Sequence, residues 1–341
     1  MLIVAGLSLK NLHPRVWDPG SPYFLPSLQA VMVSYGEFHQ MPAQMRKAQE
    51  VGLRRYLNVP DGVNIYLDNG AFYFLRSGDR AERRTYQAFV ETAKPDWYPI
   101  AFDVIPTPEM SNARQRQCFD GTMSANRAFS HDGYVPVVHV CRILDEYVKA
   151  IVGNPRLAAK DRIALGAIVP NLLRAPKALS YEAVLEKLSH VRATFYDKEV
   201  HVFGIGGTAT VHLAALLKID SVDSSGWRNR AARGIVQLPG SGDRMVTNLG
   251  KWRGRSPSKD EWNKLRNCPC PSCHAKGLRG LKASGLKGFC CRATHNLWIL
   301  LEEARWLKKH LRDETYLRNY RRRLDNSIYL PLITKLLETR L

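Results

Sequence analysis

The chain has 341 residues, of which 45% are hydrophobic and 24% are charged. This composition is typical of a globular protein and excludes extensive disorder. No apolar run approaches the roughly 20 residues that span a bilayer, so we expect no membrane partner. The formal net charge of +19 favours a polyanionic partner, because Lys and Arg side chains attract phosphates.

The first predicted element is a strand at the start of the chain, in MLIVAGLSLKNLHPRVWDPG. Its apolar run follows no basic segment and precedes no small-residue cleavage site, so we expect a cytoplasmic protein. From residue 29 to 240, short apolar runs alternate with longer segments of helical spacing. The runs predict strands at Ala30–Ser34, Asn64–Leu67, Trp97–Phe102, Tyr134–Val138, Arg162–Leu165, His201–Phe203 and Asp220–Val222. The longer segments predict helices within 41–57, 109–129, 142–153, 180–191 and 208–217.

This alternation predicts the fold class, an α/β chain with a parallel sheet covered by helices. Seven such strands favour a (β/α)8 TIM barrel, whose eighth strand we place at Gly234–Leu238. An open doubly wound sheet is the alternative. The predicted domains are a catalytic barrel over 1–250, a zinc-binding subdomain over 251–311 and a basic C-terminal helical segment over 312–341.

Carboxylates follow three of the predicted strands, as Asp68, Asp103 and Asp223. In a barrel, the ends of the strands meet at one mouth, where the chemistry takes place. Each Asp could instead cap the next helix, but three together favour a catalytic or metal-binding group, because clustered carboxylates repel one another. Three further residues occupy the same position after their strands: His139, Gly166 and Gly204.

The cysteines predict a metal site. Five of the seven lie between residues 268 and 291, which is unlike a disulfide framework. Cys268, Cys270 and Cys273 supply three thiolates, and with one imidazole they would form a closed tetrahedral site for structural Zn²⁺. We place the fourth ligand at His295, at the start of a helix predicted over Asn296–Leu311. The competitors for that place are His274, Cys290 and Cys291.

The C-terminal quarter concentrates the positive charge. Residues 251–341 contain 21 Lys and Arg against 8 Asp and Glu. Two basic blocks lie at 308–312 and at 321–323, the second in a helical segment predicted over Thr315–Leu341. Such a surface would attract nucleic acid, although a solvated helix face in a basic protein is the alternative.

Five motifs, in this order, resemble the tRNA-guanine transglycosylase superfamily over roughly residues 29–311. LDNGAF at 67–72 resembles the family's D-S-G-G-F, and AFDVIPTP at 101–108 resembles its F-D-x-x-x-P. ALGAIVP at 164–170 resembles a Gly-Gly loop that contacts the base, and HVFGIGG through SVDSS at 201–225 resembles the segment that leads to the nucleophile. The fifth motif is the cysteine pattern with its histidine.

The resemblance implies a base-exchange enzyme, a pentosyltransferase, on a (β/α)8 barrel. Asp223 would be the nucleophile, Asp68 the general base, and Asp103 the residue that reads the guanine edge. The backbone of Gly166 and Ala167 would meet the base, on which Phe72 or Tyr73 would stack. An embedded guanine would be flipped into the barrel mouth, with Arg228 and Arg230 holding phosphates.

Departures from the family pattern fall around the substrate. Asn69 and Ala71 replace Ser and Gly, whereas Tyr73 and His139 each stand where the tRNA enzymes have Gln. SSGWRNRAARG after the nucleophile lacks their L-P-T-R. This pattern resembles the DNA 7-deazaguanine transglycosylases, which implies DNA and a free 7-deazaguanine such as preQ0 as partners, with possible helper proteins. The alternatives are a tRNA-guanine transglycosylase and a non-catalytic nucleic-acid-binding subunit.

Overall fold

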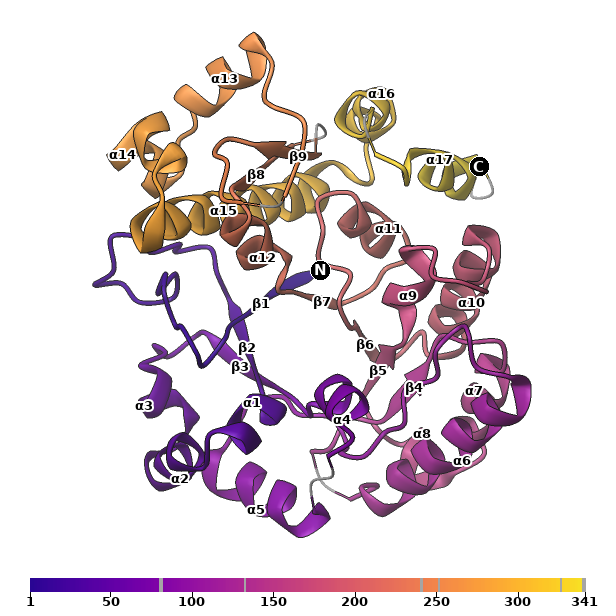
Figure 1. The fold of residues 1–341 in the computed structure, drawn as a ribbon. Coiled ribbons are helices and arrows are strands. Elements are labelled where there is room, and N and C mark those ends of the chain that lie inside the picture. The colour runs from indigo at the N-terminus through magenta and orange to yellow at the C-terminus, as the bar shows by residue number, and fades with distance from the viewer. Residues whose placement is uncertain (80–81, 132, 240–241, 251, 326, 339–341) are drawn as a thin grey trace.

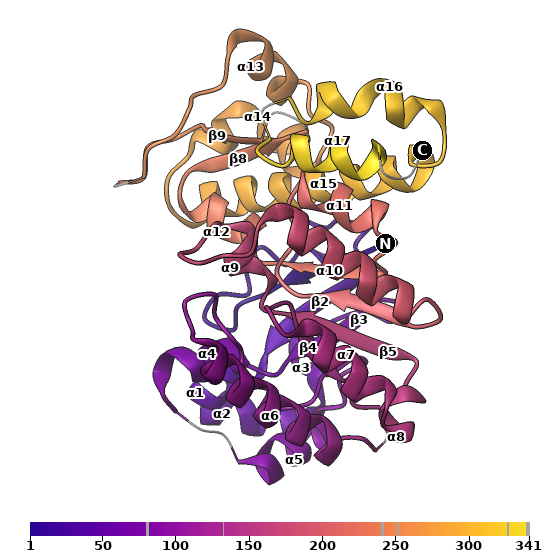
Figure 2. The ribbon, with the colours of Figure 1, turned by 90° about the vertical axis from the view of Figure 1, so that its right-hand side faces the viewer.

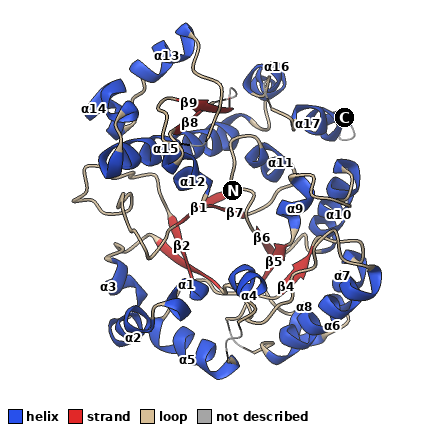
Figure 3. Ribbon diagram, viewed as in Figure 1, coloured by secondary structure: helices blue, strands red, loops and turns tan. Residues whose placement is uncertain are grey.

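The computed structural model describes residues 1–79, 82–131, 133–239, 242–250, 252–325 and 327–338. Seven parallel strands form a curled sheet in the order β3-β2-β1-β7-β6-β5-β4, and helices surround it (Figures 1 and 3). Its strands are β1 (Leu2–Gly6), β2 (Ala30–Ser34), β3 (Asn64–Asp68), β4 (Val137–His139), β5 (Arg162–Gly166), β6 (Glu199–Val202) and β7 (Ser221–Ser224). A separate antiparallel hairpin contains β8 (Ile235–Leu238) and β9 (Gly242–Met245).

The helices cover the outside of the sheet and form most of the C-terminal region. The first ten are α1 (Tyr35–Gln40), α2 (Pro42–Val51), α3 (Leu53–Leu57), α4 (Ala71–Ser77), α5 (Arg83–Ala93), α6 (Asn112–Ala128), α7 (Leu144–Val152), α8 (Pro155–Ala158), α9 (Ile168–Leu172) and α10 (Tyr181–Thr194). The others are α11 (Thr210–Leu216), α12 (Gly226–Ala232), α13 (Lys259–Arg266), α14 (Pro271–Lys282), α15 (Gly285–His310), α16 (Glu314–Arg323) and α17 (Leu330–Glu338). None of the described helices is long and apolar enough to cross a membrane.

The predicted strand at the start of the chain is confirmed as β1, which pairs with β2 on one side and with β7 on the other. The strands are apolar on both faces, because one face meets the interior and the other the helices. Segment 97–100 lies between the two edge strands of the sheet. It makes single parallel bridges, Tyr66 with Trp97 and Pro99 with Val135. The strand predicted at Trp97–Phe102 is reduced to these bridges, since Pro99 has no N–H to donate to a ladder.

The strand predicted at Gly234–Leu238 exists as β8, but its predicted place in the parallel sheet is wrong. It pairs with β9 outside that sheet. The hairpin shares a second hydrophobic core with the cysteine segment, including Val236, Leu238 and Leu265. Figure 2 shows this region and α13 to α17 stacked on one side of the seven-stranded sheet.

Three predicted helices have different limits. Segment 41–57 is broken into α2 and α3 at Gly52, whose φ of 79° is not helical. His295 lies in the middle of α15, not at the start of a helix. The glycines at the start of α15 lower its helix propensity, but the segment that follows them is buried, and this packing stabilises the longer helix. The helix predicted over Thr315–Leu341 is two helices, α16 and α17; residues 339–341 lie outside the described part of the chain.

A buried polar network attaches the C-terminal helices to the ring around the sheet. Glu303 of α15 accepts hydrogen bonds from His212 of α11 (2.8 Å) and from Arg323 of α16 (2.9 and 2.7 Å). Burial acts to raise the pKa of Glu303, but these bonds outweigh it, so that the pKa is lowered. The carboxylate of Glu303 is therefore ionised and fully paired inside the molecule.

Candidate active site and metal centre

The three predicted aspartates, Asp68, Asp103 and Asp223, line one cavity of about 440 Å³. Asp68 is the last residue of β3, Asp103 follows segment 97–100, and Asp223 lies near the end of β7. The cavity therefore opens at the carboxyl ends of the strands, where parallel α/β folds place their ligands. The other predicted substrate-binding residues that line it are Phe72, His139, Gly166, Ala167 and Gly204.

Asp103 has two polar neighbours, and its side chain is only 5% exposed. The side-chain amide of Asn69 donates a hydrogen bond to Oδ1 (2.6 Å), and His139 Nε2 lies 3.2 Å from Oδ2. Phe102, the preceding residue, has a φ of 64°, in the left-handed region that costs free energy for a residue with a side chain. This turn ends the extended segment just before Asp103.

Asp68 has the perturbed pKa expected of an acid–base group. Burial and the charges of Asp223 and Asp103 raise its pKa to about 6, although the hydroxyl of Ser34 and the backbone N–H of Gly70 donate hydrogen bonds that lower it. Asp68 can thus both hold and release a proton near neutral pH. Ser34 was not predicted; as the last residue of β2, it occupies the same strand-end position as the aspartates.

Asp223 is oriented by backbone. The N–H of Gly204 donates to its Oδ1 at 2.6 Å. The buried His201 of β6 lies beneath it, with Nε2 3.6 Å from the same oxygen and Nδ1 2.9 Å from the hydroxyl of Ser221. His201 is not among the predicted site residues; its signal in the sequence is a polar residue inside an otherwise apolar strand of a parallel sheet.

The loop after β5 approaches the site closely. A Cβ added at Gly166 would lie 2.8 Å from His139 Nδ1, so only glycine leaves His139 its place beside Asp103. Ala167 has a φ of 60°, and the amide of Asn171 donates to its carbonyl oxygen at 3.1 Å. The predicted Gly166–Ala167 backbone is therefore exposed to the cavity in a fixed conformation.

Of the two aromatic residues expected to stack on the base, the structure brings only Phe72 to the cavity. Its side chain is 58% exposed at the rim. Tyr73, the next residue of α4, lies instead against Gly36 and in ring contact with His39 and Phe74. Consecutive helical residues point about 100° apart, so α4 can direct only one of them into the cavity.

The predicted metal ligands lie together and are all buried. The Nδ1 atom of His295 is 3.5 Å from the sulfur of Cys268, 3.8 Å from that of Cys270 and 3.3 Å from that of Cys273. In the described part of the chain, this is the one group of three or more Cys, His, Asp or Glu residues whose ligand atoms gather within reach of one ion. The three aspartates do not form such a group among the described residues.

The structure favours His295 as the fourth ligand. Its Nε2 donates to the carbonyl oxygen of Gln237 on β8 (2.9 Å). Because a carbonyl can only accept, Nε2 carries the proton and Nδ1 keeps its lone pair for the metal. Cys290 and Cys291 are buried outside the group, and His274 is exposed.

Most of the arginines expected to hold phosphates already bind other groups of the protein. Arg228 is 7% exposed and donates to the backbone of Asn11 and His13, so that expectation is wrong. Arg230 pairs with Asp243 at 2.7 Å. Of the block at 321–323, Arg323 is taken up by the buried Glu303, whereas Arg321 and Arg322 remain exposed.

No protein-family model matches this chain, and no curated protein matches its sequence.

Proposed function

We propose that this chain is a base-exchange transglycosylase of the tRNA-guanine transglycosylase superfamily, which replaces guanine in DNA with a 7-deazaguanine such as preQ0. The observation that carries the proposal is the meeting of Asp68, Asp103 and Asp223 in one cavity of about 440 Å³, a size suited to one nucleoside-like group. The proposed fold is a (β/α)8 barrel in which segment 97–100 takes the place between β3 and β4. Its two bridges support this.

Asp103 is suited to read the guanine edge. Hydrogen-bonded by Asn69 and with His139 Nε2 3.2 Å from its other oxygen, its carboxylate can accept hydrogen bonds from N1–H and from the exocyclic amine. The backbone beside Ala167 can meet the other edge, and Phe72 can cover the face of the ring. Each of these groups belongs to the same cavity.

In the first half of the reaction, Asp223 attacks C1′ and the bond from C1′ to N9 of guanine breaks, which leaves a glycosyl ester. Asp68 in its acid form gives the proton that N9 takes up. In the second half, the incoming base loses its N9 proton to Asp68, and N9 displaces Asp223 from C1′. Two inversions give net retention, and the proton returns to Asp68.

We also propose that the metal is structural Zn²⁺. Zinc bonds of about 2.3 Å to sulfur and about 2.0–2.1 Å to nitrogen give tetrahedral edges of about 3.6 Å between sulfur and nitrogen, which is close to the separations around His295 Nδ1. Four protein ligands leave no open position, so Cys268, Cys270, Cys273 and His295 would hold the ion to stabilise the fold.

The test is an exchange assay on DNA and on tRNA that carry radiolabelled guanine, with unlabelled preQ0 and with Asp223→Ala as the control. We expect label to leave DNA only, and only with the unaltered protein. Release from tRNA alone would replace DNA by tRNA as the substrate. Release from neither, with pure and folded protein, would contradict the proposal.

A further inference from the structure

A second cavity of about 530 Å³ adjoins the aspartate cavity. The two share Val169, Gly204 and Ser225 as lining residues. Successive residues of a strand face opposite sides, and accordingly Asp223 of β7 lines the first cavity and Ser224 the second. The loop between them packs directly on β7, because a Cβ at Gly206 would lie 2.5 Å from the carbonyl oxygen of Asp223.

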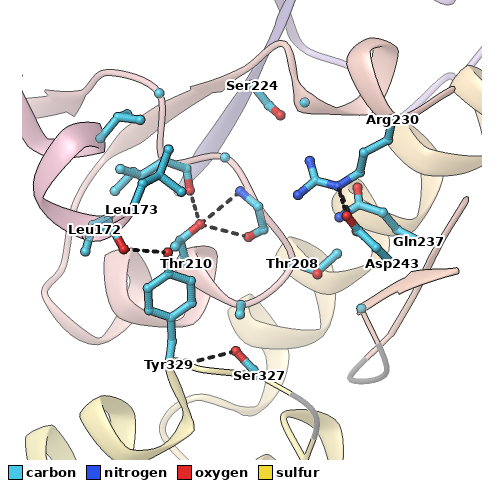
Figure 4. A pocket seen from close by; sticks show the side chains of 18 of the residues that line it. Leu172, Leu173, Thr208, Thr210, Ser224, Arg230, Gln237, Asp243, Ser327 and Tyr329 are labelled. Atoms are coloured by element: carbon cyan, nitrogen blue, oxygen red, sulfur yellow. Dashed lines mark hydrogen bonds and ion pairs between the residues drawn. The ribbon is translucent and has the colours of Figure 1, made fainter. Parts of the chain in front are cut away.

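One wall of the second cavity is polar and comes from the β8–β9 hairpin. Gln237 and Asp243 are register partners in the hairpin, so their side chains point to the same face. Figure 4 shows Asp243 bound to Arg230 beside Gln237. Arg230 is the one cation among the described lining residues, and this pairing leaves the wall close to neutral.

Gln237 is a buried polar residue whose side chain lines the second cavity. The residue is 3% exposed, and its backbone N–H and carbonyl are bound to Asn296 and His295. Its side-chain amide bonds to no residue that the structure describes. Gln237 lines the cavity, so its amide can offer one donor and one acceptor to the edge of a ligand bound there.

The opposite wall is apolar. It contains Leu172 and Leu173 at the end of α9 and Ile328 and Tyr329 before α17. Leu173 is 70% exposed and Ile328 66% exposed. The hydroxyl of Tyr329 donates to the carbonyl oxygen of Leu172 at 3.3 Å, which holds the two segments together (Figure 4). Apolar side chains opposite a polar edge form a slot for a flat, uncharged group.

We propose that this second cavity binds the nucleobase next to the target guanine in the same strand, and that the Gln237 amide contacts the edge of that base. The proposal rests on the proposed function. A nucleobase has the required shape, with two apolar faces and donors and acceptors on its rim. The neutral lining disfavours a phosphate, and the shared lining residues place the second cavity directly beside the cavity that contains Asp223.

The test measures binding of fluorescent single-stranded DNA with one guanine to full-length Asp223→Asn protein, in which the ester cannot form. Three strands are compared: an intact strand, and strands with an abasic site on the 5′ or the 3′ side of the guanine. We expect one abasic site to weaken binding about 5- to 150-fold, the equivalent of about 1–3 kcal/mol for a stacked base. Gln237→Met and, separately, Leu173→Ala should weaken binding of the intact strand and leave binding of that abasic strand unchanged.

Gln117→Met, an exposed glutamine on α6, is the matched control and should change neither strand. The proposal would be overturned if Gln237→Met and Leu173→Ala weakened binding of the intact and abasic strands equally. It would also be overturned if neither abasic site changed the affinity of the Asp223→Asn protein for the strand. These outcomes leave the proposed function standing if the protein still prefers strands that contain guanine. Absence of that preference would overturn both.

Discussion

Asp68, Asp103 and Asp223 interact through their charges as well as through the base they would share. Burial and the two neighbouring carboxylates raise the pKa of Asp68 to about 6. In the proposed reaction Asp223 becomes an ester and loses its charge, which removes one of these causes and lowers the pKa of Asp68. The nucleophile would thereby convert Asp68 from an acid in the first half of the reaction into a base in the second.

The pH dependence of exchange should reveal this coupling. We expect kcat/KM for DNA, which depends on free enzyme with protonated Asp68, to fall about tenfold per pH unit above about 6. By contrast, kcat/KM for the free base depends on the glycosyl-enzyme with deprotonated Asp68, whose pKa is lower. It should therefore stay constant at high pH and decrease only when the pH falls below that lower pKa. Steady-state rates from pH 4.5 to 9 check this, and Asp68→Asn should abolish exchange. Two profiles with the same midpoint would contradict the coupling.

Asp68→Asn also has a predicted effect on stability. The folded protein binds the Asp68 proton more tightly than the unfolded chain does, so its contribution to stability is present below the unfolded pKa, ~3.9, and is lost as the pH rises through about 6. The neutral amide keeps this contribution. We expect the variant to be more stable at pH 7.5, by up to about 3 kcal/mol, in urea unfolding. Lower stability of the variant at that pH would show that the ionised carboxylate of Asp68 does not destabilise the folded protein.

Gly166 tests whether His139 positions Asp103. Gly166→Ala would place a methyl group 2.8 Å from His139 Nδ1, so the imidazole must shift from its present place beside Asp103. We expect about a tenfold or greater loss of affinity for free guanine or preQ0 in calorimetric titrations, with the fold retained. Gly254→Ala is the control, since its Cβ would meet only ordinary contacts at 3.6 Å. Unchanged affinity in Gly166→Ala would exclude the positioning role of His139.

At the scale of elements, the metal site is bound to the hairpin that forms part of the second cavity. His295 of α15 donates to Gln237 of β8, and Asn296 Oδ1 accepts from the Gln237 N–H (2.8 Å). One metal ion would therefore fix the cysteine segment, α15 and β8 relative to one another. The sequence placed β8 in the barrel because its apolar run looks like that of any strand.

Loss of the metal should loosen this hairpin. We expect one metal ion per chain in the unaltered protein and almost none in Cys273→Ser, measured by elemental analysis. Amide hydrogen exchange in β8 and β9 should rise at least about tenfold in the variant, because metal binding and local folding are coupled. Cys290→Ala, a buried cysteine outside the group, should keep its metal. Full metal content in Cys273→Ser would contradict the assignment of the ligands.

At the scale of the whole molecule, Glu303 of α15 joins α16, the next helix in the chain, to α11, whose His212 lies 91 residues earlier. Removal of one member leaves buried charges without a partner, which is costly. The two C-terminal helices lie beside the ring around the sheet in both views (Figures 1 and 2). The position of Tyr329, and with it one wall of the second cavity, depends on this attachment.

Glu303→Gln should destabilise the protein by about 2–4 kcal/mol, measured by chemical denaturation at pH 7. The lowered pKa of Glu303 means that its contribution is present above the unfolded pKa, about 4.3, and is lost as the pH falls. The difference from the unaltered protein should therefore shrink as the pH falls below about 4.3. Glu302→Gln, whose carboxylate makes a more exposed pair with Arg305, should cost less than about 1 kcal/mol. Equal losses in the two variants would contradict the role of the network.

Sequence alone predicted the strand–helix alternation, the aspartates at the strand ends and the group of three cysteines, because each depends on local periodicity or on short spacings. It left the fourth member of that group open, and the structure places His295 there. The sequence could not decide what depends on distant partners. Tertiary contacts made β8 part of a hairpin, turned Tyr73 away from the cavity, engaged Arg228 with the N-terminal backbone and brought His201 beneath Asp223. Strand pairing, burial and the pairing of charges arise between residues far apart in the chain, and only the folded structure fixes them.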